Sequence, residues 1–230
     1  MKTKLLLSAI FGVAAWSLSS MAAASWDSGP CPGTGTAPCI EAVVSGNTYH
    51  FNGSGGHAGV WHGLPTTGAD FEFVGTNVDL NCALDLNCTL GLSGKVQKCQ
   101  DPNGDWRIGV QVNAADVSGS FLCNAVTVGG FPWYSKDPTI ANHCPFEDDC
   151  DSFIPYDPSA SSYTANFGEI NVSAIGMSLV NQGHVHGVVF TPGAGANFSF
   201  ASDFYDCEEN ADCSITGVLT LDNADSLDIH

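Results

Sequence analysis

Apolar and polar residues alternate along residues 84–97, which read LDLNCTLGLSGKVQ. The apolar positions are Leu84, Leu86, Cys88, Leu90, Leu92 and Val96. A period of two predicts a β-strand with one buried face. Residues 106–112 repeat the pattern, with Trp106 on the apolar face, and the intervening DPNGD is typical of a turn. The two stretches predict a central β-hairpin with Trp106 in the core.

Further short apolar segments follow at strand length, with Gly, Pro or Asn between them. CIEAVVS and NTYHF predict a first short hairpin, and residues 117–128 predict a third central strand with Phe121 and Cys123 on one face. Later candidates are GEINVSAIGMSLV, GHVHGVVF, ANFSFASDF and SITGVLTL. The mature chain shows no convincing helical apolar stripe. We therefore expect an all-β fold, a single antiparallel β-sandwich with a barrel as the alternative.

The first residues resemble an export signal. Lys2 and Lys4 precede an apolar run, and Ala22 to Ala24 supply the small residues that a signal peptidase requires. The run is too short and interrupted for a transmembrane anchor. Residues 1–24 are predicted to be a signal peptide, and residues 25–230 a single β domain that is secreted to the periplasm or the cell exterior.

All ten cysteines lie after the predicted leader. An even number in an oxidising compartment predicts a disulfide-stapled domain. Cys144 and Cys150 are expected to clasp the PFEDD loop between them. Cysteine ligation of zinc is the alternative, and it is disfavoured because such sites use gaps of two to four residues. The expected disulfide cysteines are Cys31, Cys39, Cys82, Cys88, Cys99, Cys123, Cys144, Cys150, Cys207 and Cys213.

The chain is strongly acidic, with a formal net charge of −18. Such a field repels phosphate backbones, so nucleic acid is not expected as a partner. An acidic insert is predicted at about residues 134–166, and Asp148 and Asp149 within it offer the oxygen ligands that calcium prefers. A second acidic cluster spans residues 203–212. Neither has the spacing of an EF-hand loop, and a solvated acidic surface is the competing interpretation.

His184 and His186, in GHVHG, are predicted to project from one face of a strand, with Val188 and Phe190 continuing that face. Two imidazoles on one face suit a metal ion, but they need a third ligand that the sequence does not nominate. His50, His57 and His62 are possible third ligands only if the fold brings them close to His184 and His186. A histidine pair at a protein rim is the competing interpretation.

Aromatic residues provide the candidate ligand contacts. Trp61 lies in a Gly-rich segment, and Trp133 and Tyr134 follow GFP, where exposure is expected. The chain contains no GxSxG elbow and no HExxH helix, and its cysteines are assigned to disulfides, so no enzyme is expected. A pair of glycosidase carboxylates would not be visible from spacing, and a secreted hydrolase therefore stays as a further alternative.

Three segments carry a family resemblance: NCTLGLSG around Cys88, GSFLCNAVTVGGFPW over residues 119–133, and DCSITGVLTLDNADSLDI near the C-terminus. They resemble the exported bacterial proteins known as protein activators of alkane oxidation, the PraB-like family. The resemblance implies a secreted, non-enzymatic protein that acts at a hydrophobic or extracellular-matrix interface, with a hydrophobic substrate or matrix component as partner. The extra cysteines and the acidic insert depart from that pattern. Calcium- or carbohydrate-dependent adhesion is the alternative function.

The resemblance also bears on disulfide pairing. If Cys88 and Cys123 are the shared strand cysteines, they bridge neighbouring strands and leave Cys82 near Cys99 across the hairpin. The alternative joins near neighbours, Cys82 to Cys88 and Cys99 to Cys123.

Overall fold

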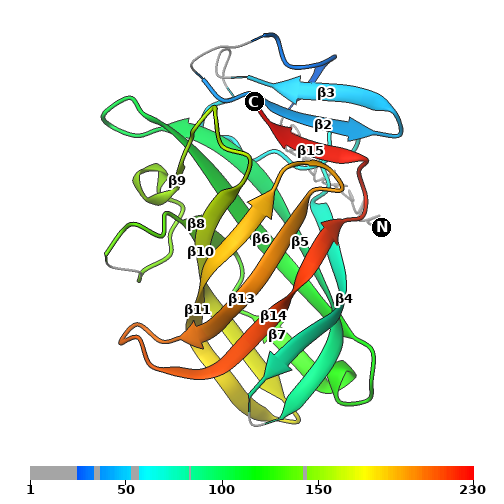
Figure 1. Ribbon diagram of the computed structural model, residues 1–230, viewed down its shortest axis with the longest axis vertical. Helices are drawn as coiled ribbons and strands as arrows, with labels where there is room; N and C mark the ends of the chain where they lie inside the picture. The colour runs from blue at the N-terminus through cyan, green and yellow to red at the C-terminus, as the bar shows by residue number, and fades with distance from the viewer. Residues whose placement is uncertain (1–24, 34–36, 53–56, 83, 142–143) are drawn as a thin grey trace, which may run out of the picture.

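A computed structural model describes residues 25–33, 37–52, 57–82, 84–141 and 144–230. The predicted signal peptide at 1–24 lies outside the described residues. The rest of the chain is built almost entirely of strands, with two short 3-10 helices (Figure 1). The prediction of an all-β, disulfide-stapled fold is confirmed, and the main sheet closes into a barrel, the alternative to the sandwich.

The central hairpin is present as predicted. It consists of β5 (Asp85–Gln100) and β6 (Trp106–Ser118). Leu86, Cys88, Leu90 and Leu92 alternate into the core, as their period of two requires. A register shift between Ser93 and Gly94 then interrupts the ladder. Trp106 is only half-buried, and the amine of Lys98 lies over its ring.

Eight strands form the barrel, and each pairs antiparallel with its neighbour in sequence order until the last pairs with the first. Besides β5 and β6 they are β4 (Phe71–Asn81), β8 (Trp133–Lys136), β10 (Tyr163–Ala174), β11 (Met177–Thr191), β13 (Asn197–Tyr205) and β14 (Ala211–Leu221). Pairing of β14 with β4 completes the ring. A barrel of eight strands has an interior that side chains nearly fill, and here apolar side chains fill it.

A separate five-stranded sheet covers one end of the barrel, the upper end in Figure 1. We call it the cap sheet. Its strands, in spatial order, are β1 (Asp27–Ser28), β3 (Asn47–Phe51), β2 (Ile40–Val44), β15 (Ser226–Ile229) and β12 (Gly193–Ala194). The predicted hairpin of CIEAVVS and NTYHF is confirmed as β2 and β3. The side chains of Ile40 in β2 and Phe51 in β3 are completely buried, so this sheet closes the core.

The predicted strand over residues 117–128 is wrong. The chain leaves β6 at Ser118, forms the 3-10 helix η1 (Cys123–Ala125) and only then enters β7 (Val126–Gly129). The hydroxyl of Ser120 accepts a hydrogen bond from the Cys123 amide, which offers the backbone an alternative to a sheet ladder. Phe121 therefore points to solvent and does not share an inward face with Cys123.

All ten cysteines are paired, as predicted. The Cys88–Cys123 bridge implied by the family resemblance is confirmed, but Cys82–Cys99, both near-neighbour pairs and the clasp of Cys144 to Cys150 are wrong. β14 lies beside β4, so Cys82 meets Cys213, and the insert cysteines bind other segments. The bridges are Cys31–Cys39, Cys82–Cys213, Cys88–Cys123, Cys99–Cys150 and Cys144–Cys207.

The predicted insert overlaps two barrel strands, because β8 ends at Lys136 and β10 begins at Tyr163. Between them the chain forms η2 (Cys150–Ser152) and the short strand β9 (Ile154–Pro155), which pairs with β6. Cys144 and Cys150 fasten this segment to the β13–β14 loop and to β5. The insert therefore lies against the outside of the barrel.

Candidate functional site

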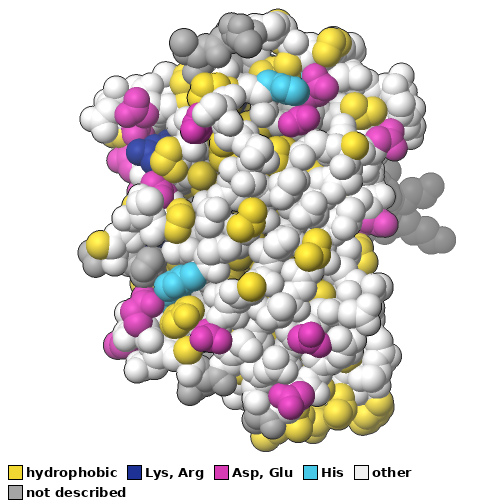
Figure 2. Space-filling view, viewed as in Figure 1, with side chains coloured by type: hydrophobic (Ala, Val, Ile, Leu, Met, Phe, Trp, Pro, Cys, Tyr) yellow, Lys and Arg dark blue, Asp and Glu magenta, His cyan; other side chains and the backbone are white. Residues whose placement is uncertain are grey.

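The end of the barrel opposite the cap sheet is apolar and exposed. It is formed by the loop before η1 and by the turn between β10 and β11, and a hydrogen bond from the Ile175 amide to the Ala125 carbonyl joins this turn to η1. The exposed fractions are 85% for Phe121, 37% for Leu122, 56% for Ile175 and 51% for Met177. Figure 2 shows hydrophobic side chains gathered at this lower end. We call these four residues the apolar end.

The apolar end is not a scattering of ordinary surface residues. Among the described residues, the other exposed large hydrophobic side chains are Val60, Val74 and Val218, which lie elsewhere. Isolated exposed apolar residues are normal on a protein surface, whereas a contiguous group marks a contact surface. Four such side chains on two adjacent loops therefore form a candidate site.

The β10–β11 turn is unusual in its sequence. Its two central residues are Ile175, with φ 51°, and Gly176, with φ 76°. Two positive φ values define the tight hairpin turn in which Asn-Gly is preferred, and a β-branched residue there is strained. The chain thus places Ile at a position where Asn would be favourable, and it exposes the side chain to solvent.

Two cavities of about 60 Å³ each lie among the described side chains of the barrel interior. One lies toward the cap sheet, beside Ile40, and the other toward the apolar end, beside Val117. Residues that line both are Leu92, Trp133, Ile170, Val185 and Phe200. An apolar cavity that holds benzene measures about 150 Å³, so neither space accommodates a molecule of that size without rearrangement.

Trp133, expected to be exposed, is 6% exposed and lies in the core. It pairs with Val112 in the β6–β8 ladder and points inward, and its indole Nε1 donates to the Gly129 carbonyl at 3.0 Å. The preceding Gly and Pro residues suggested a loop, but a short barrel strand begins directly after them. Any ligand contact of Trp133 would therefore be made inside the barrel.

The other two predicted ligand-contact residues lie side by side on the outside. The ring centroids of Trp61 and Tyr134 are 5.9 Å apart, and both side chains are half-buried. The indole of Trp61 donates to the Asp148 carboxylate at 3.1 Å, and the side-chain amide of Gln111 donates to the Tyr134 hydroxyl at 3.3 Å. Aromatic faces bordered by carboxylate and amide groups can bind a polar ligand by stacking and hydrogen bonding.

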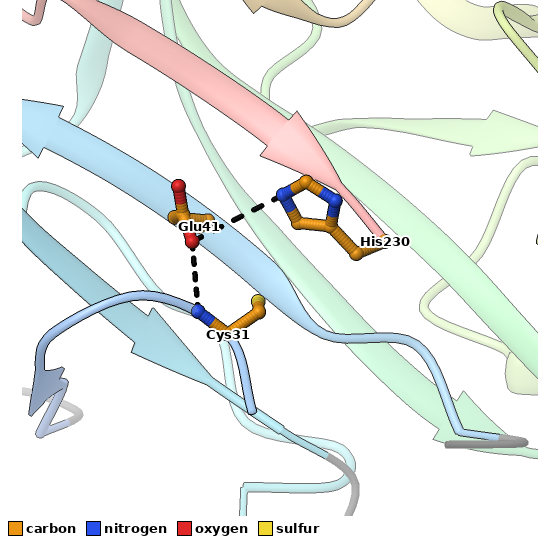
Figure 3. A group of neighbouring side chains, drawn as sticks. All are labelled: Cys31, Glu41 and His230. Carbon is orange, nitrogen blue, oxygen red and sulfur yellow. Dashed lines mark hydrogen bonds and ion pairs between the residues drawn. The ribbon is translucent and has the colours of Figure 1, made fainter. Parts of the chain in front are cut away.

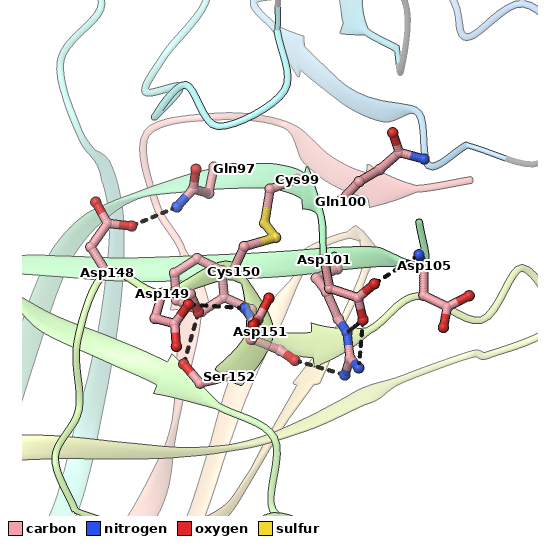
Figure 4. The surroundings of a disulfide bond; sticks show 12 residues. Gln97, Cys99, Gln100, Asp101, Asp105, Asp148, Asp149, Cys150, Asp151 and Ser152 are labelled. Carbon is pink, nitrogen blue, oxygen red and sulfur yellow. Dashed lines mark hydrogen bonds and ion pairs between the residues drawn. A yellow bond between two sulfur atoms is a disulfide. The ribbon is translucent and has the colours of Figure 1, made fainter. Parts of the chain in front are cut away.

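The predicted calcium residues have protein partners. Gln97 donates to the second oxygen of Asp148 at 3.0 Å, and Asp149 caps η2 by accepting from the Asp151 amide (Figure 4). The adjacent Cys99–Cys150 bridge holds both aspartates against β5. Among the described residues, neither aspartate belongs to a group of three potential metal ligands.

His184 and His186 do converge with a third potential ligand, Glu209. The distances from His184 Nε2 and His186 Nε2 to the two Glu209 carboxylate oxygens are 3.5 and 3.9 Å. We call these three residues the His–Glu cluster. Glu209 belongs to the acidic segment singled out in the sequence, but its proximity to the histidines depends on pairing of β11 with β13, which the sequence does not reveal.

The face of β11 differs from the prediction. His184 and His186 stand outside the barrel with Tyr205, whereas Val188 and Phe190 line its interior. A register shift between Val185 and Val189, with Gly187 at φ 63°, separates the two halves of the strand. The irregularity reverses the alternation, as a β-bulge does.

A second group, Cys31, Glu41 and His230, lies in the cap sheet region (Figure 3). Cys31 is bonded to Cys39 and so offers no thiolate. Glu41 accepts a hydrogen bond from the Cys31 amide at 2.7 Å, and His230 lies 4.0 Å from the same carboxylate. This group is a local polar network without the donor set of a metal site.

Ionisable groups are buried at the capped end. His62 stacks on Phe51 with centroids 3.7 Å apart, and burial lowers its pKa from 6.5 to about 4. Burial likewise lowers the pKa of Lys98 to about 8, although its amine donates to the Pro38 carbonyl. His57 contacts His62 at 3.2 Å. His50, His57 and His62 thus lie at the capped end and not in the His–Glu cluster.

Comparison of the chain with family models, curated proteins and solved structures found no match. Within the described part of the chain, no helix has the length and apolar character needed to cross a membrane. Five disulfides are typical of a protein that folds in an oxidising compartment.

Proposed function

We propose that this protein is an exported, non-catalytic protein that acts at a hydrophobic interface, and that the apolar end makes the contact. The observation that supports it best is the exposure of Phe121, Leu122, Ile175 and Met177 at the end of the barrel opposite the cap sheet. The resemblance to activators of alkane oxidation points to the same kind of interface.

The turn geometry adds a second argument. A left-handed backbone at a residue other than Gly costs about 1–2 kcal/mol, and exposed apolar surface contributes nothing to folding. Ile175 combines both disadvantages. Strain retained at a solvent-exposed position favours a functional role for the side chain.

The net charge and the size of the interior cavities indicate which kind of hydrophobic phase the protein contacts and with which surface. With a net charge of −18 the protein is repelled by anionic lipid surfaces, which favours an uncharged hydrocarbon phase. The interior cavities of about 60 Å³ are too small for a sizeable apolar ligand. The outer surface of the barrel end is therefore a better contact site than its interior.

Adsorption to a liquid-alkane emulsion tests the proposal. Wild-type protein should be depleted from the aqueous phase, and the double variant Phe121→Ser/Ile175→Asn should remain mostly in solution. The matched control is Val74→Thr/Val218→Thr, which removes two exposed apolar side chains from the barrel wall and should adsorb like the wild type. Equal adsorption of the two double variants, or none by the wild type, would remove the apolar end as the contact site.

Carbohydrate-dependent adhesion is the second candidate, and the contact between Trp61 and Tyr134 favours it. Soluble oligosaccharides that bind there should raise the melting temperature of the wild type and leave that of Trp61→Ala unchanged. No thermal shift in the wild type with a broad glycan panel would reject this candidate. Calcium added alone provides the corresponding test of calcium-dependent adhesion.

A further inference from the structure

The His–Glu cluster is built on one strand, β11, and on the loop between β13 and β14, outside the barrel wall. The imidazoles of His184 and His186 lie with centroids 4.7 Å apart, and the Tyr205 ring stacks on His186 at 4.4 Å. On the other side, the Phe146 ring covers His184, whose side chain is completely buried. The two rings are therefore held by packing and are not free to rotate away from one another.

The loop between β13 and β14 places Glu209 over these rings. Asp206 accepts hydrogen bonds from the Glu208 and Asn210 amides, and Cys207 is bonded to Cys144. The hydrogen bonds from Asn210 lower the pKa of the Asp206 carboxyl. Glu209 itself has φ 65°, in the left-handed region that a residue of its type rarely adopts. The loop is thus fixed with a carboxylate directed at two imidazoles.

We propose that His184, His186 and Glu209 bind a divalent transition-metal ion, for which Zn²⁺ is the reference. One ring nitrogen from each histidine and one carboxylate oxygen all lie within 4.8 Å of one another. In a tetrahedral zinc site with bonds of about 2.0–2.1 Å, ligand atoms stand about 3.4 Å apart. Glu209 Oε1 lies 3.5 Å from His184 Nε2 and Glu209 Oε2 lies 3.9 Å from His186 Nε2, so the carboxylate is close to this ligand spacing with each imidazole.

The donor set selects the class of metal. Two imidazoles and one carboxylate suit Zn²⁺ or Cu²⁺, whereas Ca²⁺ prefers a larger set of oxygen ligands. His184 Nδ1 lies 4.0 Å from the sulfur of Cys144, and a proton on this nitrogen leaves Nε2 available as a ligand.

An ion pair between protonated histidine and Glu209 is the competing explanation, and metal titration separates the two. Full-length mature protein is treated with a chelator, dialysed and titrated calorimetrically with ZnCl₂ at pH 7.5, with CaCl₂ as a second titrant. The wild type should bind one Zn²⁺ per chain and should not bind Ca²⁺ with comparable affinity. Absence of Zn²⁺ binding by folded wild-type protein would overturn the proposal.

Variants locate the site. His186→Ala and Glu209→Gln alter partly exposed side chains, and each should weaken Zn²⁺ binding at least about tenfold. His50→Ala is the matched control, because His50 contacts the Gly29 carbonyl in the cap sheet and should leave the affinity unchanged. Wild-type affinity in both cluster variants, with their circular dichroism spectra intact, would contradict the assignment.

Discussion

Each end of the barrel contains a two-residue hairpin turn with positive φ at both residues, but the two turns have different residues at the first position. In the cap sheet, the tight turn between β2 and β3 consists of Ser45, with φ 50°, and Gly46. At the apolar end, the turn between β10 and β11 has the same geometry but uses Ile175 and Gly176. A small polar side chain suits a turn that only reverses the chain. The large apolar side chain at the opposite end is the feature on which the proposed contact surface rests.

Burial differs in the same way between the ends. Phe51, in the cap sheet, is completely buried, whereas Phe121 at the other end is almost fully exposed. One aromatic side chain stabilises the fold, and the other contributes little to it. Substitutions at the capped end should therefore mainly lower the free energy of unfolding. Substitutions at the apolar end should mainly reduce binding to a hydrophobic phase.

The largest expected effect is at the capped end. Phe51→Ala removes a buried ring that packs on Trp26 and His62, and it should lower the free energy of unfolding by about 3–5 kcal/mol. Phe121→Ala should change it by no more than about 0.5 kcal/mol. Denaturant unfolding measures both. Similar losses for the two variants would contradict the assignment of Phe121 to a surface role.

A pH dependence should arise at the same end. Burial lowers the pKa of His62 from 6.5 to about 4, so the unfolded chain binds a proton there in a range where the folded chain does not. The free energy of unfolding should therefore fall as the pH drops from 6.5 to 4. His62→Gln should reduce this slope, as measured by denaturant unfolding across that range. An unchanged slope in the variant would assign the acid sensitivity to other groups.

A smaller effect, of opposite sign, is expected at the apolar end. Ile175→Asn replaces a β-branched residue at positive φ with the residue that such turns favour, and it should raise the free energy of unfolding by about 1 kcal/mol. Thermal and denaturant unfolding both measure the gain. A loss of stability in this variant would show that the Ile175 side chain contributes to folding.

Local patterns in the sequence predicted the local structure well. The alternation of apolar and polar residues from Leu86 to Leu92 predicts a strand with one buried face, and that strand is present as part of β5. The pattern failed where a few residues break the pleat: at Ser120, whose hydroxyl supports a turn, and at Gly187, where the strand face reverses. Such irregularities depend on side-chain hydrogen bonds and on strand register, and neither can be predicted from the alternation of apolar and polar residues.

Long-range features were harder to predict. Alternation shows that a strand has a buried face but not which strand lies beside it, so the pairings of Cys82 and Cys99 were wrong. For the same reason Glu209 was recognised as acidic but not as a neighbour of His184. The apolar end was missed because Phe121 was assigned to an inward strand face. In addition, Ile175 and Gly176 were placed inside one predicted strand, GEINVSAIGMSLV, which the structure divides between β10 and β11.

The central claim is that the apolar end contacts a hydrophobic phase, and one comparison tests it most directly. The fraction of protein removed from water by a liquid-alkane emulsion is measured for the wild type, Ile175→Asn and Ser45→Asn. Both variants introduce Asn at the same position of a tight turn, but only the first removes an apolar side chain from the apolar end. We predict that Ile175→Asn adsorbs less than the wild type and that Ser45→Asn adsorbs equally well. Equal adsorption of all three proteins, or an equal decrease in both variants, would contradict the claim.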